Sequence, residues 1–160
     1  MCDYSLMCIP NRLAKEGEDL VVHRFPTGSL GFASSLDLDR RAAEEQAKAH
    51  GFWATLKSFF SPPKTADIPA VCIPPGAQLS LSGVPKRLQM DLGVDREEEV
   101  PFTQLTAASN THRDAVRFRN GCYTLLQHLT EGVKAKVLDL SLAEESEPVQ
   151  EERFGPLFRR

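Results

Sequence analysis

Cationic side chains, a thiol and an imidazole recur in the C-terminal third of the chain at spacings that could place them on one face of a β-hairpin. Two strand-like runs, residues 115–119 and 122–129, flank Asn120-Gly121. Asn-Gly is typical of a two-residue type I′ turn, in which both central residues have positive φ. Because side chains alternate between the faces of a strand, this turn predicts an outer face with Arg117, Arg119, Cys122, Thr124 and His128, and an inner face with Val116, Phe118, Tyr123 and Leu125.

Two lysines can extend this face. The next strand-like run, residues 133–140, places Lys134 and Lys136 on the outer side if the alternation continues. The predicted ligand-binding set is therefore Arg117, Arg119, Cys122, His128, Lys134 and Lys136. Such a strip could bind an anion, a nucleic-acid backbone or an acidic partner. The alternative is that it is only the solvated face of an amphipathic antiparallel sheet.

Cys2 could act as a nucleophile. Removal of Met1 would leave Cys2 at the amino terminus, where an α-amino group with a pKa of about 8 could serve as the base for the thiol. Amidotransferases that use an N-terminal cysteine usually have glycine next, whereas this chain has Asp3 and is shorter than those enzymes. A thiol-dependent enzyme is therefore the alternative function.

His112 and Asp114 are two further catalytic candidates. Residues two apart on an extended segment point the same way, so Asp114 could orient the His112 imidazole for base catalysis. A polar turn is the competing interpretation. The four cysteines and four histidines lack the spacing of a zinc site, and no phosphate loop, Ser-His-Asp set or carboxylate pair is recognised. The sequence therefore predicts no metal and no cofactor.

Composition limits the class of protein. The chain has 160 residues, 41% hydrophobic and 26% charged, and a net charge of −3, which suits a single domain and makes nucleic acid an unexpected partner. It contains no apolar run of the roughly 18 residues that a membrane span needs, and its start does not resemble a secretory signal. A cytoplasmic location follows, in which the four cysteines are expected to be thiols.

The elements that must position these residues are mostly strands. Alternating or apolar runs predict strands at residues 19–25, 70–73, 78–81 and 100–105, and a three-strand meander over 115–140. Pro26, Gly28 and Gly31 interrupt the pattern after the first strand. Val84, Leu88 and Leu92 predict a short helix that ends at Gly93.

An insertion separates the first two strands. Helix formers followed by an aromatic stripe over residues 52–60 predict an amphipathic helical insertion at about 37–61. It could pack over an open barrel end or lie on a membrane surface. The fold class is thus mainly β (α+β): a small antiparallel barrel or curled sheet, with this inserted helix and the C-terminal meander, in one domain of residues 1–142. Residues 143–160 predict a flexible acidic tail.

Several stretches resemble a family of short bacterial proteins of unknown function. The resemblance rests on the start Met1-Cys2-Asp3-Tyr4-Ser5 and on later stretches, namely 14–15, 31–32, 71–76, 113–118 and 120–121. It implies a coherent fold over residues 1–140, with residues 36–67 as an insertion, and no activity. The expected function is a non-enzymatic binding or interaction module for a protein or an anionic ligand. The sequence does not predict an oligomeric state.

Overall fold

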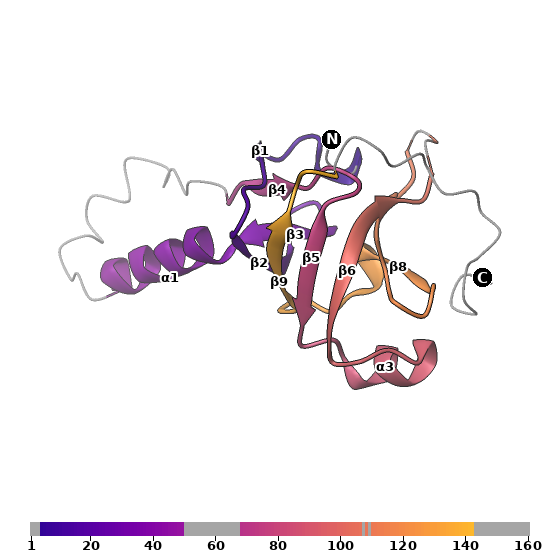
Figure 1. Ribbon diagram of the computed structural model, residues 1–160. Coiled ribbons are helices and arrows are strands. Elements are labelled where there is room, and N and C mark those ends of the chain that lie inside the picture. The colour runs from indigo at the N-terminus through magenta and orange to yellow at the C-terminus, as the bar shows by residue number, and fades with distance from the viewer. Residues whose placement is uncertain (1–3, 50–67, 107, 109, 143–160) are drawn as a thin grey trace.

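The fold is a nine-stranded sheet that curls into a half-barrel. The structure is a computed structural model that describes residues 4–49, 68–106, 108 and 110–142. The strand order is β1-β4-β3-β2-β9-β5-β6-β7-β8 (Figure 1). The prediction of a mainly β fold with a curled sheet and an inserted helix is confirmed.

The N-terminal residues form one half of the sheet. A 3₁₀ turn, η1 (Tyr4–Leu6), leads to β1 (Asn11–Leu13), β2 (Asp19–Arg24) and β3 (Leu30–Ser34), and β4 (Ala70–Cys72) follows the insertion. β2 and β3 form an antiparallel hairpin, whereas β1 lies parallel to β4. The glycine-rich stretch that interrupts the sequence pattern is therefore a hairpin turn plus the start of β3, which is buried along its whole length.

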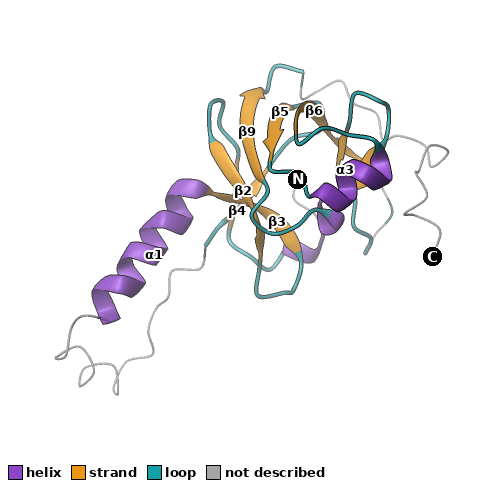
Figure 2. Ribbon diagram, turned by 90° about the horizontal axis from the view of Figure 1, so that it is seen from below, coloured by secondary structure: helices purple, strands orange, loops and turns teal. Residues whose placement is uncertain are grey.

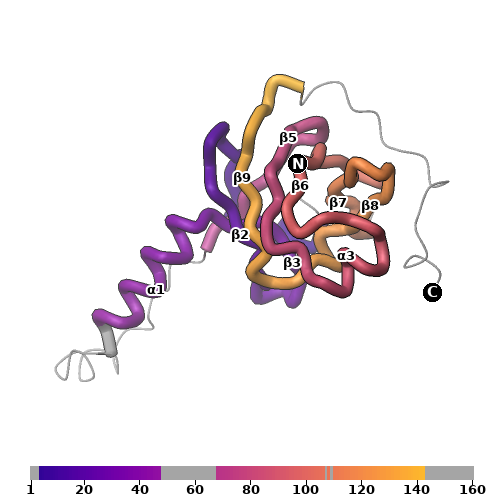
Figure 3. Tube along the Cα trace, turned by 60° about the horizontal axis from the view of Figure 1, so that its bottom comes forward, coloured from indigo at the N-terminus to yellow at the C-terminus, as the bar shows by residue number. Residues whose placement is uncertain are grey.

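The C-terminal residues form the other half. It contains β5 (Gln78–Ser82), β6 (Glu97–Gln104), β7 (Asp114–Arg117), β8 (Tyr123–Leu125), the 3₁₀ turn η2 (Leu126–His128) and β9 (Lys134–Asp139). β9 pairs with β2 and β5 and not with β8 (Figure 3). The predicted meander is therefore correct only for its first two strands, and the third returns to the middle of the sheet.

The main core lies inside the curl. It combines alternate residues of the strands, such as Leu20 and Val22 of β2, with two buried leucines of the short helix α3 (Lys86–Leu92). Gly93 ends α3 in the left-handed conformation, φ +64°, as the sequence predicts. Burial of these apolar side chains supplies the main driving force for the curled shape.

The insertion leaves the sheet at one point and returns to it at the same point. Ala33 of β3 pairs with Ala70 of β4, so residues 35–69 connect two neighbouring strands. The helix α1 (Ser35–Ala49) projects away from the sheet (Figure 2). The predicted aromatic stripe at 52–60 and the predicted tail at 143–160 lie outside the described residues.

A side-chain amide connects the two halves of the sheet at the open side of the half-barrel. Gln127 of η2 accepts a 2.9 Å hydrogen bond from the backbone amide of Leu30 and donates a 2.7 Å bond to the carbonyl oxygen of the same residue. The amide group of Gln127 thus takes the place that a neighbouring strand would occupy beside β3. It joins the end of β8 to the opposite half of the sheet.

Candidate ligand-binding surface

The β7–β8 turn differs from the predicted one. The amide of Gly121 donates to the carbonyl of Phe118 at 2.9 Å, and the amide of Phe118 donates to the carbonyl of Cys122 at 2.8 Å. Gly121 has φ +86°, but Asn120 does not have positive φ. This is a three-residue loop with the glycine in the left-handed position, as in a type I turn followed by a G1 bulge. The predicted type I′ turn is wrong.

The longer loop shifts the strand register by one residue. Arg117 faces Tyr123 and Val116 faces Thr124, where the type I′ turn would place Thr124 opposite Arg117. A one-residue slip moves each side chain of β8 to the other face. Thr124 is therefore buried inside, whereas Tyr123 packs with Leu105 and Ala115 in a small cluster on the outer side.

The six predicted ligand-binding residues do not form one strip. Register places Lys136 of β9 opposite Ser80 of β5, and Ser80 opposite Glu99 of β6. The two lysines of β9 and the two arginines at the end of β7 are thus three strand spacings apart, roughly 14 Å. Exposed carboxylates of Glu97 and Glu99 lie between them, so the face carries two separate cationic regions.

The first region is a groove at the β7–β8 hairpin. It has a volume of about 380 Å³ and is lined by Glu99, Pro101, Arg117, Phe118, Arg119, Gly121 and Tyr123. Arg117 and Arg119 are exposed, and neither forms an ion pair within the part of the chain that the structure describes. The backbone amide of Arg119 donates to the buried carboxylate of Glu98, which ties the turn to β6. We call this the arginine groove.

The second region is a hollow over the middle of the sheet. It has a volume of about 440 Å³ and is lined by Asp19, Leu20, Ser35, Ser80, Ser82, Lys134, Ala135 and Lys136. The lysines come from β9, the serines from β5 and from the start of α1, and the carboxylate from β2. We call this the lysine hollow.

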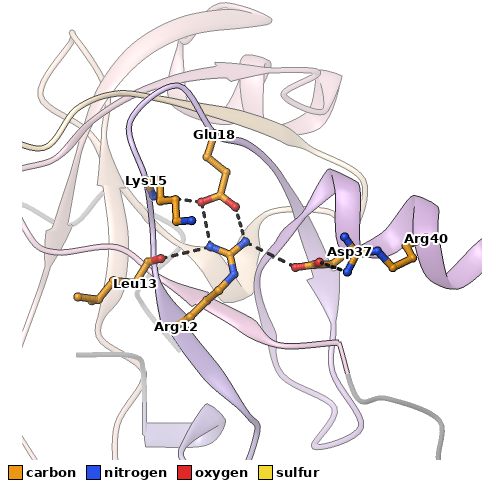
Figure 4. A network of polar contacts seen from close by, with 6 residues as sticks. All are labelled: Arg12, Leu13, Lys15, Glu18, Asp37 and Arg40. Carbon is orange, nitrogen blue, oxygen red and sulfur yellow. Dashed lines mark hydrogen bonds and ion pairs between the residues drawn. The ribbon is translucent and has the colours of Figure 1, made fainter.

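A network of polar contacts holds the start of α1 in place (Figure 4). Ser35, at this end of the helix, lines the lysine hollow. Arg12 donates two hydrogen bonds to the carboxylate of Glu18, one of them at 3.1 Å, and lies 3.5 Å from Asp37. Asp37 also lies 3.7 Å from Arg40. Hydrogen bonding to Arg12 holds the pKa of Glu18 below its ordinary value, and the same contact raises the pKa of Arg12.

The predicted catalytic residues lie near the N-terminal segment. The ring of His112 contacts that of Tyr4, with centroids 5.5 Å apart. Asp114 is buried and accepts a 2.9 Å hydrogen bond from the side-chain amide of Gln104. His128 is exposed on η2, where partial burial and the nearby His112 lower its pKa. Cys2 lies outside the described residues, so the structure does not place it against these groups.

The cysteines differ in state. Cys72 is disulfide-bonded, which corrects the expectation that all four are thiols. Cys8 is a free, exposed thiol. Cys122 is also free but half-buried, and it packs against the main core. Cys122 therefore belongs more to the core than to the outer face on which the type I′ register would place it.

Comparisons with protein-family models, curated proteins and solved structures gave no match. No helix among the described residues combines the length and apolar character needed to cross a membrane. Within the described residues, no group of three or more His, Cys, Asp or Glu side chains could hold a metal ion.

Sequence reasoning missed several residues that line these regions. The predicted type I′ turn places Tyr123 on the core face, and Glu99 precedes the predicted strand at 100–105, although β6 begins at Glu97. Ser80 and Ser82 carry a signal that could have identified them, because they alternate with the buried Leu79 and Leu81. Their proximity to the lysines depends on β9 returning to β5, which no local pattern indicates.

Proposed function

We propose that this protein is a non-enzymatic interaction module that binds an acidic segment of a protein partner in the arginine groove. The observation that carries the proposal is the placement of two exposed guanidinium groups, without ion-pair partners among the described residues, beside Tyr123 and Pro101. Guanidinium groups bind carboxylates through paired hydrogen bonds. The groove therefore offers a charged contact and an apolar contact to the same ligand.

The composition of the groove favours a peptide over a bare ion. Tyrosine and arginine are enriched among the residues that dominate protein interfaces. Glu99 lines the same groove and would repel a ligand with dense negative charge, which favours a single carboxylate next to an apolar side chain. On a chain with a net charge of −3, this local cationic region can steer an acidic partner.

The proposal is tested by capture of partners with the wild type and with Arg117→Glu/Arg119→Glu. The charge-reversed variant should lose at least one partner, and that partner should bind the wild type more weakly as salt rises, because the Debye length falls from about 10 Å at 0.1 M to about 3 Å at 1 M. Arg87→Glu, on the exposed face of α3, is the matched control. Identical partner sets from all three proteins, with unchanged circular dichroism, would contradict the proposal.

The alternative function is a thiol-dependent enzyme that uses Cys2. One observation favours it: the contact between Tyr4 and His112 brings the N-terminal segment to an imidazole. Cys2→Ser would abolish the activity of such an enzyme. A cytoplasmic location also stays a proposal, and the disulfide at Cys72 weighs against it, because disulfides are rare in reducing compartments.

A further inference from the structure

We propose that the lysine hollow is a second, independent site that binds a small organic phosphate monoester. The proposal does not depend on the arginine groove, because the two regions share no lining residue, although Ser80 of the hollow lies opposite Glu99 of the groove. It rests on the charge, the hydrogen-bond donors and the size of the hollow.

The sheet register brings the cations and the hydroxyl groups together. Lys136 lies opposite Asp19 on one side and Ser80 on the other, and Lys134 lies opposite Ser82. Side chains that face each other across an antiparallel pair have Cβ atoms about 4.5–5.5 Å apart. A ligand over the middle of β9 can therefore reach ammonium and hydroxyl groups from neighbouring strands at the same time.

The charge of the hollow remains available to a ligand. Neither lysine forms an ion pair with any residue in the described ranges, and Asp19 is the one carboxylate that lines the hollow. Glu18, which directly precedes β2, and Asp37 of α1 are engaged by Arg12. The guanidinium of Arg12 thus offsets these two negative charges, and the exposed carboxylates of Glu97 and Glu99 lie one strand away, opposite Ser82 and Ser80.

The donors of the hollow suit the oxygens of a phosphate. Ser35, Ser80 and Ser82 line it together with the two lysines, and a hydroxyl or ammonium group can donate to a phosphate oxygen. Ser35 is the first residue of the 15-residue helix α1. The positive end of the helix dipole adds to the field of the lysines there.

The size of the hollow favours a phosphate that carries an organic group. A volume of about 440 Å³ falls within the roughly 300–1,000 Å³ of small-molecule sites, and a bare ion would fill only part of it. The carboxylate of Asp19 can accept a hydrogen bond from a hydroxyl of the organic part. The hollow therefore fits a polar monoester, for which glycerol phosphate is a simple probe.

The test is a titration of the full ¹⁵N-labelled chain with glycerol phosphate at constant ionic strength, followed by NMR. We expect saturable shifts of the backbone amides of Ser35, Ser80, Ser82 and Lys136. Lys134→Gln/Lys136→Gln should weaken binding by roughly tenfold or more, because it removes charge-assisted hydrogen bonds. Lys134→Arg/Lys136→Arg should retain binding within a few fold and shows that the fold tolerates substitution there. Lys86→Gln, on an exposed lysine of α3, is the matched control.

Other phosphate sources provide further arms of the experiment. Inorganic phosphate should bind more weakly than glycerol phosphate, and vesicles with phosphatidic acid should bind no better than neutral vesicles. Equal shifts with sodium chloride, an equal effect of the Lys86→Gln variant, or binding to vesicles alone would each overturn the proposal. Arg117→Glu/Arg119→Glu should bind glycerol phosphate as the wild type does, so that failure of the groove and failure of the hollow are distinguishable.

Discussion

The side-chain amide of Asn120 donates a 2.7 Å hydrogen bond to the backbone carbonyl oxygen of Leu92, the last residue of α3. The same amide donates to the carbonyl of Gly93 at 3.1 Å, and its oxygen accepts a 2.9 Å bond from the amide of Cys122. One residue of the β7–β8 turn therefore satisfies carbonyl groups at the end of a helix that precedes it by almost 30 positions. Such carbonyls have no partner within the helix.

We expect Asn120→Ala to reduce the free energy of unfolding by about 1–3 kcal/mol, because it removes these bonds and leaves helix-end carbonyls without a protein donor. Urea denaturation measures the change. Gln46→Ala, on the exposed part of α1, is the control and should stay within about 0.5 kcal/mol. Equal effects of the two substitutions would contradict a capping role for Asn120.

Phe118→Ala should cost about 3–5 kcal/mol of stability, because Phe118 is 2% exposed within the main core. Leu36→Ala is a matched control, since Leu36 is 72% exposed at the start of α1. Urea melts of the two variants compare a buried side chain with a solvated one. A loss below about 1 kcal/mol for Phe118→Ala would mean that the hairpin register is different from the one described.

The cysteines should react with an alkylating reagent in a fixed order. Cys8 should be labelled first because its thiol is free and exposed, and Cys122 should follow slowly because it is half-buried against the core. Cys72 should be labelled only after reduction, since it is disulfide-bonded. Mass spectrometry of native samples with and without a reductant gives the order. Rapid labelling of Cys72 before reduction is the result that would contradict this assignment.

Acid should destabilise the fold through His23 and His128. Burial lowers the pKa of both imidazoles below the ordinary value of about 6.5. The folded state therefore binds fewer protons than the unfolded state, so stability is complete above the unfolded pKa and falls as the pH drops through it towards the folded value. The Glu131 carboxylate, 3.4 Å from His23, and the nearby Arg41 modify the pKa of His23 in opposite directions.

Replacement of both histidines by glutamine should therefore flatten the loss of stability between pH 7 and pH 5, as measured by urea melts at each pH. Glu18 contributes in a different window: its pKa is lowered by Arg12, so its contribution is lost only as the pH falls below the ordinary value of about 4.3. A double variant with the same pH dependence as the wild type would exclude the imidazoles as the source.

Local patterns predicted most strands and the short helix of this fold. The alternation of Leu79 and Leu81 with serines and the Pro85–Gly93 boundaries of α3 correspond to β5 and α3 as observed. The predicted strand at residues 19–25 corresponds to β2, whose buried residues are Leu20 and Val22, whereas β1 was not predicted. The helical insertion begins at Ser35, two residues before the predicted start.

The arrangement of the candidate ligand-binding surface was harder to predict from the sequence. Asn120-Gly121 favours a type I′ turn locally, but the hydrogen bonds of Asn120 to α3 favour another turn, and the register moved by one residue. The position of β9 between β2 and β5 depends on contacts between distant parts of the chain. For this reason the sequence pattern joined Arg117 and Lys134 into one strip, which the sheet divides into two regions.

The pairing of Ala33 with Ala70 has a consequence for how this protein can vary. Because residues 35–69 leave and rejoin the sheet at a single paired position, lengthening the connection changes mainly the entropy of loop closure. Each doubling of a flexible loop costs only about 0.6 kcal/mol. The arm that begins with α1 can therefore be exchanged, extended or shortened beyond its first turn while the strands keep their register. The sheet is thus the fixed part of the protein, and the inserted segment that begins with α1 is the part that can vary.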